Sequence, residues 1–402
     1  MKTEIISKDI FTAAEIIKNG GLVAVPTETV YGLAGNGLDE AAVNDIYEVK
    51  GRPSIKPLSL MVSGAEAMDM YCVDVPEQAR ILAKKFWPGP LTIVLKAKEN
   101  IPSIVLAGGT TVGLRCPDHP LTLELLKCVK LPLAAPSANP SFDESPKTAQ
   151  KVMEYFDGKI AAVIDGGPCG IGKESTIVDL SINPYKILRQ GALAEEAVAE
   201  ALADELKIIG ITGGTGCGKT TALNVLEDMG ALVLDCDKVY HELLASSVEL
   251  LHDLDEAFPG SVQQGKIDTK ALGKIVFNDD EQLLKLNKIT HKHILAEIKC
   301  RLQRHAMNGG KIAALDAIEL VSSGLAEECF TTLAVLADRE LRAQRIMARD
   351  GVDRDYALLR IDAQHPDSYF IENCEHVLYN NADAKSFETA CTKLFEEVLN
   401  NG

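Results

Sequence analysis

A glycine-rich loop between an apolar run and a helical stretch constrains the fold of this chain most strongly. Gly213, Gly218, Lys219 and Thr220 fit the pattern G-x-x-x-x-G-K-[ST] within the string KIIGITGGTGCGKTT. Glycines let backbone N–H groups turn inward around phosphate oxygens, and the start of the next helix adds a partial positive charge. The alternative, a glycine-rich turn with a surface lysine, is disfavoured by the flanking strand and helix. The pattern therefore predicts a phosphate-binding loop.

The loop residues predicted to bind ATP form one continuous run. Lys219 would reach the β- and γ-phosphates, and the Thr220 hydroxyl would ligate the magnesium ion that ATP carries. The complete run is Gly213, Gly214, Thr215, Gly216, Cys217, Gly218, Lys219, Thr220 and Thr221.

Asp235 ends the next apolar run, residues 231–235, and Asp237 follows it, at the strand end where ligands bind in open α/β sheets. Asp235 or Asp237 could accept a proton from an attacking hydroxyl, or hold magnesium through water. The alternative for one of them is a helix N-cap. We predict that Lys219, Asp235 and Asp237 are catalytic, and the sequence does not decide which of the two aspartates is the base.

A row of arginines lies within a stretch predicted to be helical, residues 339–364. Arg342, Arg345 and Arg349 share one helical face, and Arg360 follows. Such a row could close over ATP as a lid and stabilise charge on the transferred phosphoryl group. The alternative is a solvated face paired with neighbouring acids, which we favour for Arg342. Arg345, Arg349 and Arg360 therefore join the predicted ATP site.

The pattern of apolar runs indicates two α/β units. Runs at 22–25 and 208–211 each open a glycine-rich turn, and an acidic, alanine-rich helical stretch separates them. We place the domains at 1–203 and 204–402; one large α/β protein is the alternative. The second half alternates strands with helices, which predicts a parallel sheet. Its expected elements are strands within 231–235, 311–320, 331–338 and 376–381, mainly helix over 246–305, and a terminal helix.

Composition narrows the class of protein. A formal net charge of −17 disfavours generic nucleic-acid binding. No apolar run approaches the roughly 20 residues that span a bilayer, and the start MKTEIISKDIF lacks the apolar core of a signal peptide. The 10 cysteines show no zinc-type spacing. We expect a cytoplasmic protein without a membrane partner.

The second half resembles dephospho-CoA kinase over most of residues 207–400. The resemblance is carried, in family order, by ITGGTGCGKTT, LVLDCDKVYHELL, LNKITHKHI, RELRAQRIMARDG and LLRIDAQ. It implies phosphoryl transfer from ATP to the ribose 3′-hydroxyl of dephospho-CoA, with an aspartate of the pair as base and the lid arginines on ATP. His291-Lys292 and residues 317–320 depart from the family pattern on the acceptor side.

The first half gathers cations and short polar side chains. Lys50 and Arg52 lie on the proline-bounded segment KGRPSIKPL, and Arg115 ends an apolar run. Further candidates are Thr27, Ser137, Asn139, Ser175 and Arg189. If these side chains line one cleft, that cleft would suit a polyanionic ligand together with a small polar ligand. Taken singly, the cations could be surface charges and PSAN an ordinary turn.

Taken together, these residues resemble the YrdC family of threonylcarbamoyl-AMP synthases over about residues 7–195. PTETVYGL, KGRPSIKPL, WPGPLT, RCPDH, PSAN and ESTIVD occur in family order. The resemblance implies a twisted α/β sheet that joins threonine, bicarbonate and ATP, with a product used by the machinery that transfers threonylcarbamoyl to tRNA. It puts ATP near Lys50, Arg52, Ser137, Asn139 and Arg189. It puts threonine near Thr27, Arg115 and Ser175.

Two details of this half stay open. Arg115 suits the threonine carboxylate, because guanidinium pairs well with carboxylate; the alternatives are the ATP phosphates or a structural bond to Asp118. The stretch PSANPSFDES departs from the family, in which a glycine commonly follows the second serine.

The expected fold class is therefore α/β: a YrdC-like twisted sheet domain, then a P-loop domain with a parallel sheet and helical acceptor and lid regions. ATP and Mg²⁺ are the expected cofactors. The competing interpretation is an RNA-binding module fused to a regulatory P-loop NTPase or another small-molecule kinase.

Overall fold

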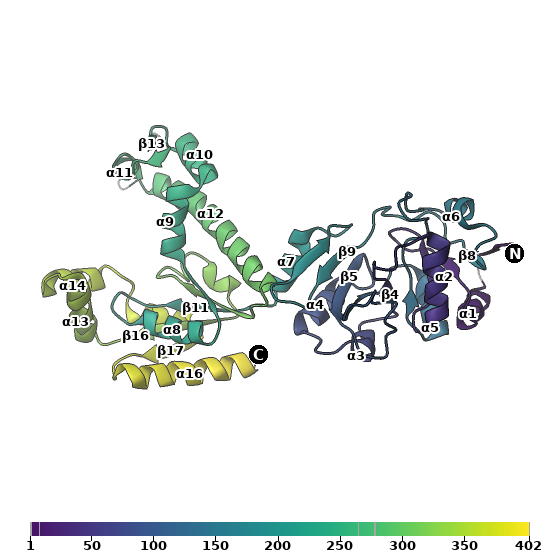
Figure 1. The fold of residues 1–402 in the computed structure, drawn as a ribbon. Helices are drawn as coiled ribbons and strands as arrows, with labels where there is room; N and C mark the ends of the chain where they lie inside the picture. Colours follow the sequence, from purple (N-terminus) through teal and green to yellow (C-terminus); the bar gives the residue numbers. More distant parts are fainter. Residues whose placement is uncertain (1, 8, 264, 277–278, 402) are drawn as a thin grey trace. The chain divides into compact units, whose positions relative to one another are not determined.

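The computed structural model describes residues 2–7, 9–263, 265–276 and 279–401. The chain forms two compact units, which are Met1–Asp204 with Met307–Gly309, and Glu205–Ala306 with Gly310–Gly402. Figure 1 follows the chain from purple at the N-terminus to yellow at the C-terminus. Among the described residues, no helix combines the length and the apolar character that crossing a membrane requires.

Short strands of the N-terminal unit join into one mixed sheet. Within the described residues they are β1 (Glu4–Ile6), β2 (Val23–Val25), β3 (Gly32–Asn36), β4 (Ser59–Met61), β5 (Leu91–Lys96), β6 (Thr111–Arg115), β7 (Leu133–Ala134), β8 (Ala162–Ile164), β9 (Thr176–Asp179) and β10 (Lys186–Arg189). Their spatial order is β1-β8-β2-β3-β7-β4-β6-β5-β9-β10. Every residue of β2 and β8 is buried, because these apolar strands have covered faces on both sides.

Helices of the N-terminal unit begin and end at recognisable signals. They are α1 (Ile10–Lys18), α2 (Glu40–Lys50), α3 (Ala67–Tyr71), α4 (Glu77–Phe86), α5 (Pro120–Val129), α6 (Ala149–Phe156) and α7 (Glu195–Ala203). The Asp39 side chain caps α2, and Gly51 ends it in a left-handed conformation. One core cluster joins buried side chains of α1 and α5 to those of β1, β2 and β8.

The C-terminal unit has a parallel sheet at its centre. Its strands are β11 (Lys207–Thr212), β12 (Leu232–Asp235), β15 (Ile312–Asp316), β16 (Thr331–Leu336) and β17 (His376–Tyr379), and their spatial order is β12-β15-β11-β16-β17. Helices α8 (Lys219–Asp228) and α16 (Ala384–Asn401) pack against the sheet through a shared apolar cluster. The predicted α/β class, with a parallel second sheet, is confirmed.

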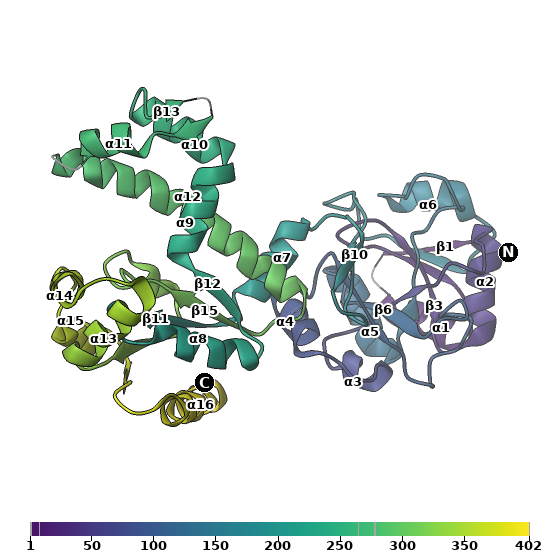
Figure 2. The ribbon, with the colours of Figure 1, turned by 60° about the vertical axis from the view of Figure 1, so that its left-hand side comes forward.

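A helical extension rises from the parallel sheet of the C-terminal unit (Figures 1 and 2). It contains α9 (Cys236–Ser246), α10 (Val248–Ala257), α11 (Thr269–Val276) and α12 (Asp280–Met307). The sequence predicted mainly helix here, but a small hairpin of β13 (Val262–Gln263) and β14 (Lys266–Ile267) interrupts it. Gly260 and Gly265 adopt positive φ around the hairpin, which a continuous helix does not allow.

The stretch 339–364 is also interrupted. It forms α13 (Arg339–Asp350) and α14 (Arg354–Asp362), because Gly351 ends the first helix in a left-handed conformation and the Asp353 side chain caps the second. A further helix, α15 (Asp367–Asn373), follows Pro366, and a short 3-10 helix η1 (Leu325–Glu328) precedes β16. Helix α13 contacts the glycine-rich loop that follows β11, because Arg342 donates to the Thr215 carbonyl.

Candidate active sites

The glycine-rich loop joins β11 to α8 in a conformation that requires its glycines. Gly213, Gly216 and Gly218 have φ values of 133°, 83° and 97°. A Cβ atom on Gly213 would lie 2.2 Å from the carbonyl oxygen of Val335. Left-handed backbone and close packing therefore both exclude larger residues here. Thr220 follows in the first turn of α8 with an exposed side chain.

Arg342 and Arg345 of α13 donate hydrogen bonds to carbonyl groups of the glycine-rich loop. Arg342 donates from Nε to the Thr215 carbonyl over 3.0 Å, and its side chain is 6% exposed. The expectation that Arg342 belongs to a solvated face is wrong, because the carbonyl groups of the loop and Gln364 satisfy its guanidinium. Arg345 donates to the Cys217 carbonyl over 3.3 Å, so it also braces the loop.

The other two arginines predicted to close over ATP, Arg349 and Arg360, both donate hydrogen bonds to the Asp350 carboxylate. Arg349 donates to Asp350 through Nε and Nη2 at 2.7 and 2.9 Å, and Arg360 donates to it over 2.6 Å. Hydrogen bonds from Arg349 and Arg360 hold the pKa of Asp350 below its ordinary value. Both arginines stay partly exposed, so they remain available to an anion that approaches from solvent.

Charged groups cluster where β11, β12 and β15 end. Lys219 Nζ donates to the Gly213 carbonyl over 3.1 Å and lies 3.7 Å from Asp316 Oδ1. Among the described residues, that buried Asp316 oxygen has no hydrogen-bond partner. Burial raises the pKa of Asp316, and Lys219 opposes the rise. Sequence reasoning missed Asp316, although the acid that ends the apolar run IAALD pairs in register with Asp235.

The two aspartates of the DxD pair occupy different environments. Asp235 Oδ1 accepts a hydrogen bond from the Lys238 amide at 3.0 Å, so Asp235 is the N-cap of α9. Asp237 instead lines a cavity of about 390 Å³ between α9, α12 and the segment after β15. His291 and Glu319, from the two stretches that depart from the family pattern, line the same cavity.

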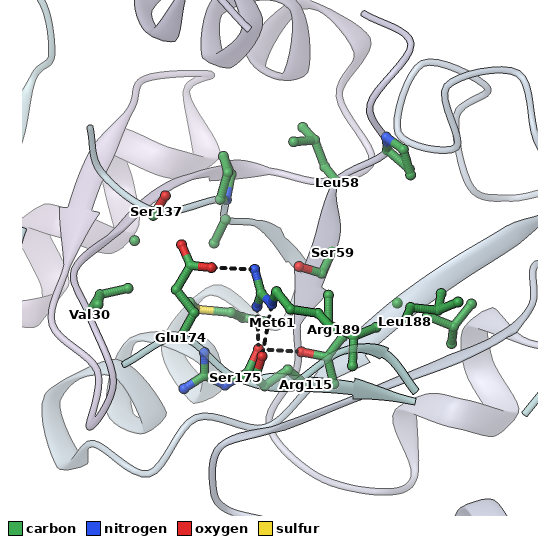
Figure 3. Close-up of a pocket in the computed structure, with 18 of the residues that line it drawn as sticks. Val30, Leu58, Ser59, Met61, Arg115, Ser137, Glu174, Ser175, Leu188 and Arg189 are labelled. Atoms are coloured by element: carbon green, nitrogen blue, oxygen red, sulfur yellow. Dashed lines mark hydrogen bonds and ion pairs between the residues drawn. The ribbon is translucent and has the colours of Figure 1, made fainter. Parts of the chain in front are cut away.

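A cavity of about 290 Å³ lies over the sheet of the N-terminal unit, at β3, β4, β5, β6, β9 and β10 (Figure 3). Of the sequence-predicted residues, it brings together Arg52, Arg115, Ser137, Ser175 and Arg189. Thr27, Lys50 and Asn139 do not line it. A lining that combines apolar side chains with converging cations suits an anionic ligand with apolar parts.

One network fixes a wall of this cavity. Arg189 donates from Nη1 to Glu174 over 2.7 Å and from Nη2 to Ser175 Oγ over 3.0 Å, and Ser175 lies 2.9 Å from Thr92 Oγ1. Figure 3 shows Glu174, Ser175 and Arg189 directed toward one another. Burial lowers the pKa of Arg189, and Glu174 opposes that effect. Glu174 is thus a site residue that sequence reasoning missed.

Arg115 is held by a second missed acid. Its Nη2 donates to Glu28 Oε1 over 2.7 Å and to Thr29 Oγ1 over 2.8 Å, and the two charged side chains are 9% and 12% exposed. The structural partner of Arg115 is therefore Glu28, whereas the Asp118 amide donates to the same glutamate. Among the described residues, Arg115 Nη1 has no hydrogen-bond partner.

The three predicted residues outside the cavity lining support its loops. Thr27 accepts hydrogen bonds from the Thr29 and Val30 amides and so closes the turn after β2. Lys50 donates to the Ser137 and Asn139 carbonyls, and burial lowers the pKa of Lys50 to about 7. Asn139 donates to Pro140 and Asp143 carbonyls, and its buried Oδ1 has no partner among the described residues.

Magnesium would fit the C-terminal unit. Thr220 and Asp316 offer the oxygen ligands that this ion prefers, and Asp316 keeps one oxygen without a hydrogen-bond partner. Among the described residues there is no group of three or more His, Cys, Asp or Glu side chains placed to hold a metal. An ion carried by substrate phosphates needs only one or two protein ligands.

Comparison with known proteins assigns both halves. Residues 15–191 match the Sua5/YciO/YrdC family model, described as telomere recombination, and residues 207–386 match the dephospho-CoA kinase model. A threonylcarbamoyl-AMP synthase of Pyrococcus abyssi is 46% identical over 48% of this chain and 56% of its own length. That of Rattus norvegicus is 35% identical over 46% of this chain and 67% of its own length.

The coverage of these similarities is uneven. The chain spans little more than half the length of several curated relatives, with shares of 56%, 55% and 52%. Among solved structures, a dephospho-CoA kinase from Campylobacter jejuni is 25% identical, with a TM-score of 0.36, over 48% of this chain and 96% of its own.

Two arginines on the same helix should differ in their effect on stability. Arg342→Ala removes buried hydrogen bonds to the glycine-rich loop, so we expect the C-terminal unit to lose about 1–3 kcal/mol of unfolding free energy. Arg349→Ala, the matched control on the exposed side, should change it by less than about 0.5 kcal/mol. Urea denaturation followed by circular dichroism measures both. Equal losses in the two variants would contradict the bracing role of Arg342.

Proposed function

The chain belongs to the Sua5/YciO/YrdC family through its N-terminal half and carries a dephospho-CoA kinase domain in its C-terminal half, and from this premise we propose a bifunctional enzyme. Residues 1–203 form L-threonylcarbamoyl-AMP and pyrophosphate from threonine, bicarbonate and ATP. Residues 204–402 transfer the γ-phosphoryl group of ATP to the 3′-hydroxyl of dephospho-CoA, giving coenzyme A. Each half thus uses ATP differently.

The observation that carries the kinase proposal is the cluster of Lys219, Asp316 and Asp237 beside the glycine-rich loop. Backbone amides of the loop and Lys219 bind the β- and γ-phosphates. Thr220 and Asp316 would hold the magnesium ion, which offsets negative charge on the phosphates. This resembles the arrangement of other P-loop phosphotransferases.

Asp237 is the base in this proposal. It lines the cavity that would receive the acceptor, whereas Asp235 is occupied as a helix cap. A carboxylate within reach of the acceptor hydroxyl takes its proton as the oxygen attacks the γ-phosphorus. Arg345 shapes the loop, while Arg349 and Arg360 would turn from Asp350 to the phosphates when the lid closes.

The observation that carries the synthase proposal is the convergence of Arg52, Arg115 and Arg189 on one cavity. The threonine amine adds to carbon dioxide with loss of a proton, or condenses with bicarbonate with loss of water. An oxygen of the resulting carbamate then attacks the α-phosphorus, so that pyrophosphate leaves. No protein nucleophile is needed, because the site holds the reactants together and stabilises their charge. Mg²⁺ on the phosphates is expected here as well.

We divide the ligands of the synthase site by position. Arg52, Ser137 and Arg189 contact ATP, while Lys50 and Asn139 hold the loop that carries Ser137. Arg115 Nη1 and Ser175 bind threonine, and the turn closed by Thr27 positions Glu28 against Arg115. The product would pass to the tRNA threonylcarbamoyl-transfer machinery. We place these reactions in the cytoplasm.

A paired assay of the full chain tests both activities. Lys219→Ala should abolish phosphoryl transfer to dephospho-CoA and leave threonine-dependent pyrophosphate release unchanged, because the two phosphate sites lie in separate units. Equal loss of both activities in a folded variant would contradict separate sites.

The two aspartates of the DxD pair provide a matched comparison. Asp237→Asn should lower kinase turnover by roughly 10²-fold or more through loss of the base, with a small change in the ATP KM. Asp235→Asn should retain most turnover, because asparagine also caps helices. Steady-state kinetics with dephospho-CoA measure both. A larger loss in Asp235→Asn would reverse the assignment.

Arg115→Ala should act on threonine. Loss of a charge-assisted bond to the carboxylate costs about 2 kcal/mol, so the threonine KM should rise roughly 30-fold or more while the ATP KM changes little. Arg115→Lys should rescue poorly, because an ammonium cannot serve Glu28, Thr29 and threonine with the same planar geometry.

The same variant separates the alternatives for Arg115. A selective rise of the ATP KM would place this arginine on the phosphates instead. A lower melting temperature with both KM values unchanged would leave it only the structural bond to Glu28.

A further inference from the structure

Phe142 has a conformation and an exposure that its local turn does not explain. It lies in the loop after Ser137, has a φ of 77° and is 87% exposed. A bulky side chain in the left-handed region is strained, and glycine is the residue that this region favours. Because the phenyl ring is exposed to solvent, burial of apolar surface does not offset the cost of this backbone conformation. Strained residues of this kind cluster at ligand-binding sites.

Phe142 does not itself line the synthase cavity, but its contacts lead to residues that do. Lys56 Nζ lies 5.1 Å from the Phe142 ring centroid, and the carbonyls of Lys56 and Pro57 accept hydrogen bonds from Arg52, which lines the cavity. On the other side, Asn139 donates to the Asp143 carbonyl over 2.8 Å. The loop is therefore fixed at both ends while the ring stays open to solvent.

The loop is also tied to the far wall of the cavity. Ser145 Oγ donates to Glu174 over 3.0 Å, and Glu174 binds Arg189 in turn. A ligand whose phosphates meet Arg52 and Arg189 would therefore have the Phe142 loop close by, because that loop is bonded to Glu174 and contacts Lys56, whose carbonyl accepts a hydrogen bond from Arg52. An aromatic face beside bound phosphates suits a nucleobase.

We infer that Phe142 is a nucleobase-stacking residue of the synthase site, which receives the purine of ATP on its open face while Lys56 covers the ring. The inference rests on the proposed synthase function. Stacking on an aromatic ring is tolerant of base identity, so Phe142 would raise nucleotide affinity more than purine selectivity.

Kinetics of full-length variants test the assignment. Phe142→Gly should raise the ATP KM for threonine- and bicarbonate-dependent pyrophosphate release about tenfold, in line with the loss of one base–aromatic stack, with the threonine KM unchanged. Its melting temperature should stay equal or rise, because glycine removes the strain. Phe142→Tyr should behave as the wild type. The matched control is Phe11→Ala, a 71% exposed aromatic residue on α1.

Three kinetic results would overturn the inference. An ATP KM within twofold of wild type in Phe142→Gly would remove the stacking role, and an equal rise of both KM values would make Phe142 a loop-positioning residue. Phe142→Leu keeps the strain and the apolar bulk but has no aromatic face, so it should resemble the glycine variant. If it matches the wild type, an apolar side chain without a ring is sufficient, and the stacking role is removed.

Fluorescence separates failure of the inference from failure of the proposed function. Trp87 is the 1 tryptophan of the chain, so Phe142→Trp adds a reporter at that position. ATP should quench this variant and leave the wild type unchanged, also in a Lys219→Ala background, and tripolyphosphate should not quench it. If the wild type releases no pyrophosphate, the proposed function fails, and this titration still decides the stacking. No quenching by ATP would overturn the inference.

Discussion

In each unit, a mostly buried ion pair at the ends of the strands organises the site around it. Arg115 and Glu28 form this pair in the N-terminal unit, and Lys219 and Asp316 form it in the C-terminal unit. A charged side chain that is removed from water is stable only when an oppositely charged or hydrogen-bonding group compensates it. Each pair therefore constrains the positions of the residues around it. The turn after β2 positions Glu28, and the loop after β11 positions Lys219.

The sequence motifs identified the glycine-rich loop and the family of each half, but they did not predict which side chains contact one another. The glycine-rich loop could be recognised because its glycines, lysine and flanking apolar run are local in sequence. Glu28 and Arg115 are separated by 87 residues, and Arg342 reaches Thr215 across 127. Contacts over such distances depend on sheet order and helix placement, which a pattern of residue types does not contain. Arg342 was therefore assigned to solvent although it is buried.

The same limit explains the acids that were missed and the helices that were interrupted. Asp316 reads as the last residue of a strand until the register of β12 and β15 sets it beside Asp235. The hairpin within the helical extension depends on the positive φ of Gly260 and Gly265. The folded backbone sets these angles, and the residue type alone does not predict them. Phe142 could be noted only as a departure from a glycine; its strain and its exposure belong to the structure.

Under the proposed function, the two units would bind ATP in different ways. Backbone amides of the glycine-rich loop would serve one site, and arginine side chains would serve the other. The first reaction would leave ADP after transfer of a phosphoryl group, and the second would leave pyrophosphate after transfer of a nucleotidyl group. The most direct measurement follows both by-products in one reaction of the full chain. ADP should form only when dephospho-CoA is added, and pyrophosphate only when threonine and bicarbonate are added. ADP that forms with threonine alone, or pyrophosphate that requires dephospho-CoA, would contradict the account.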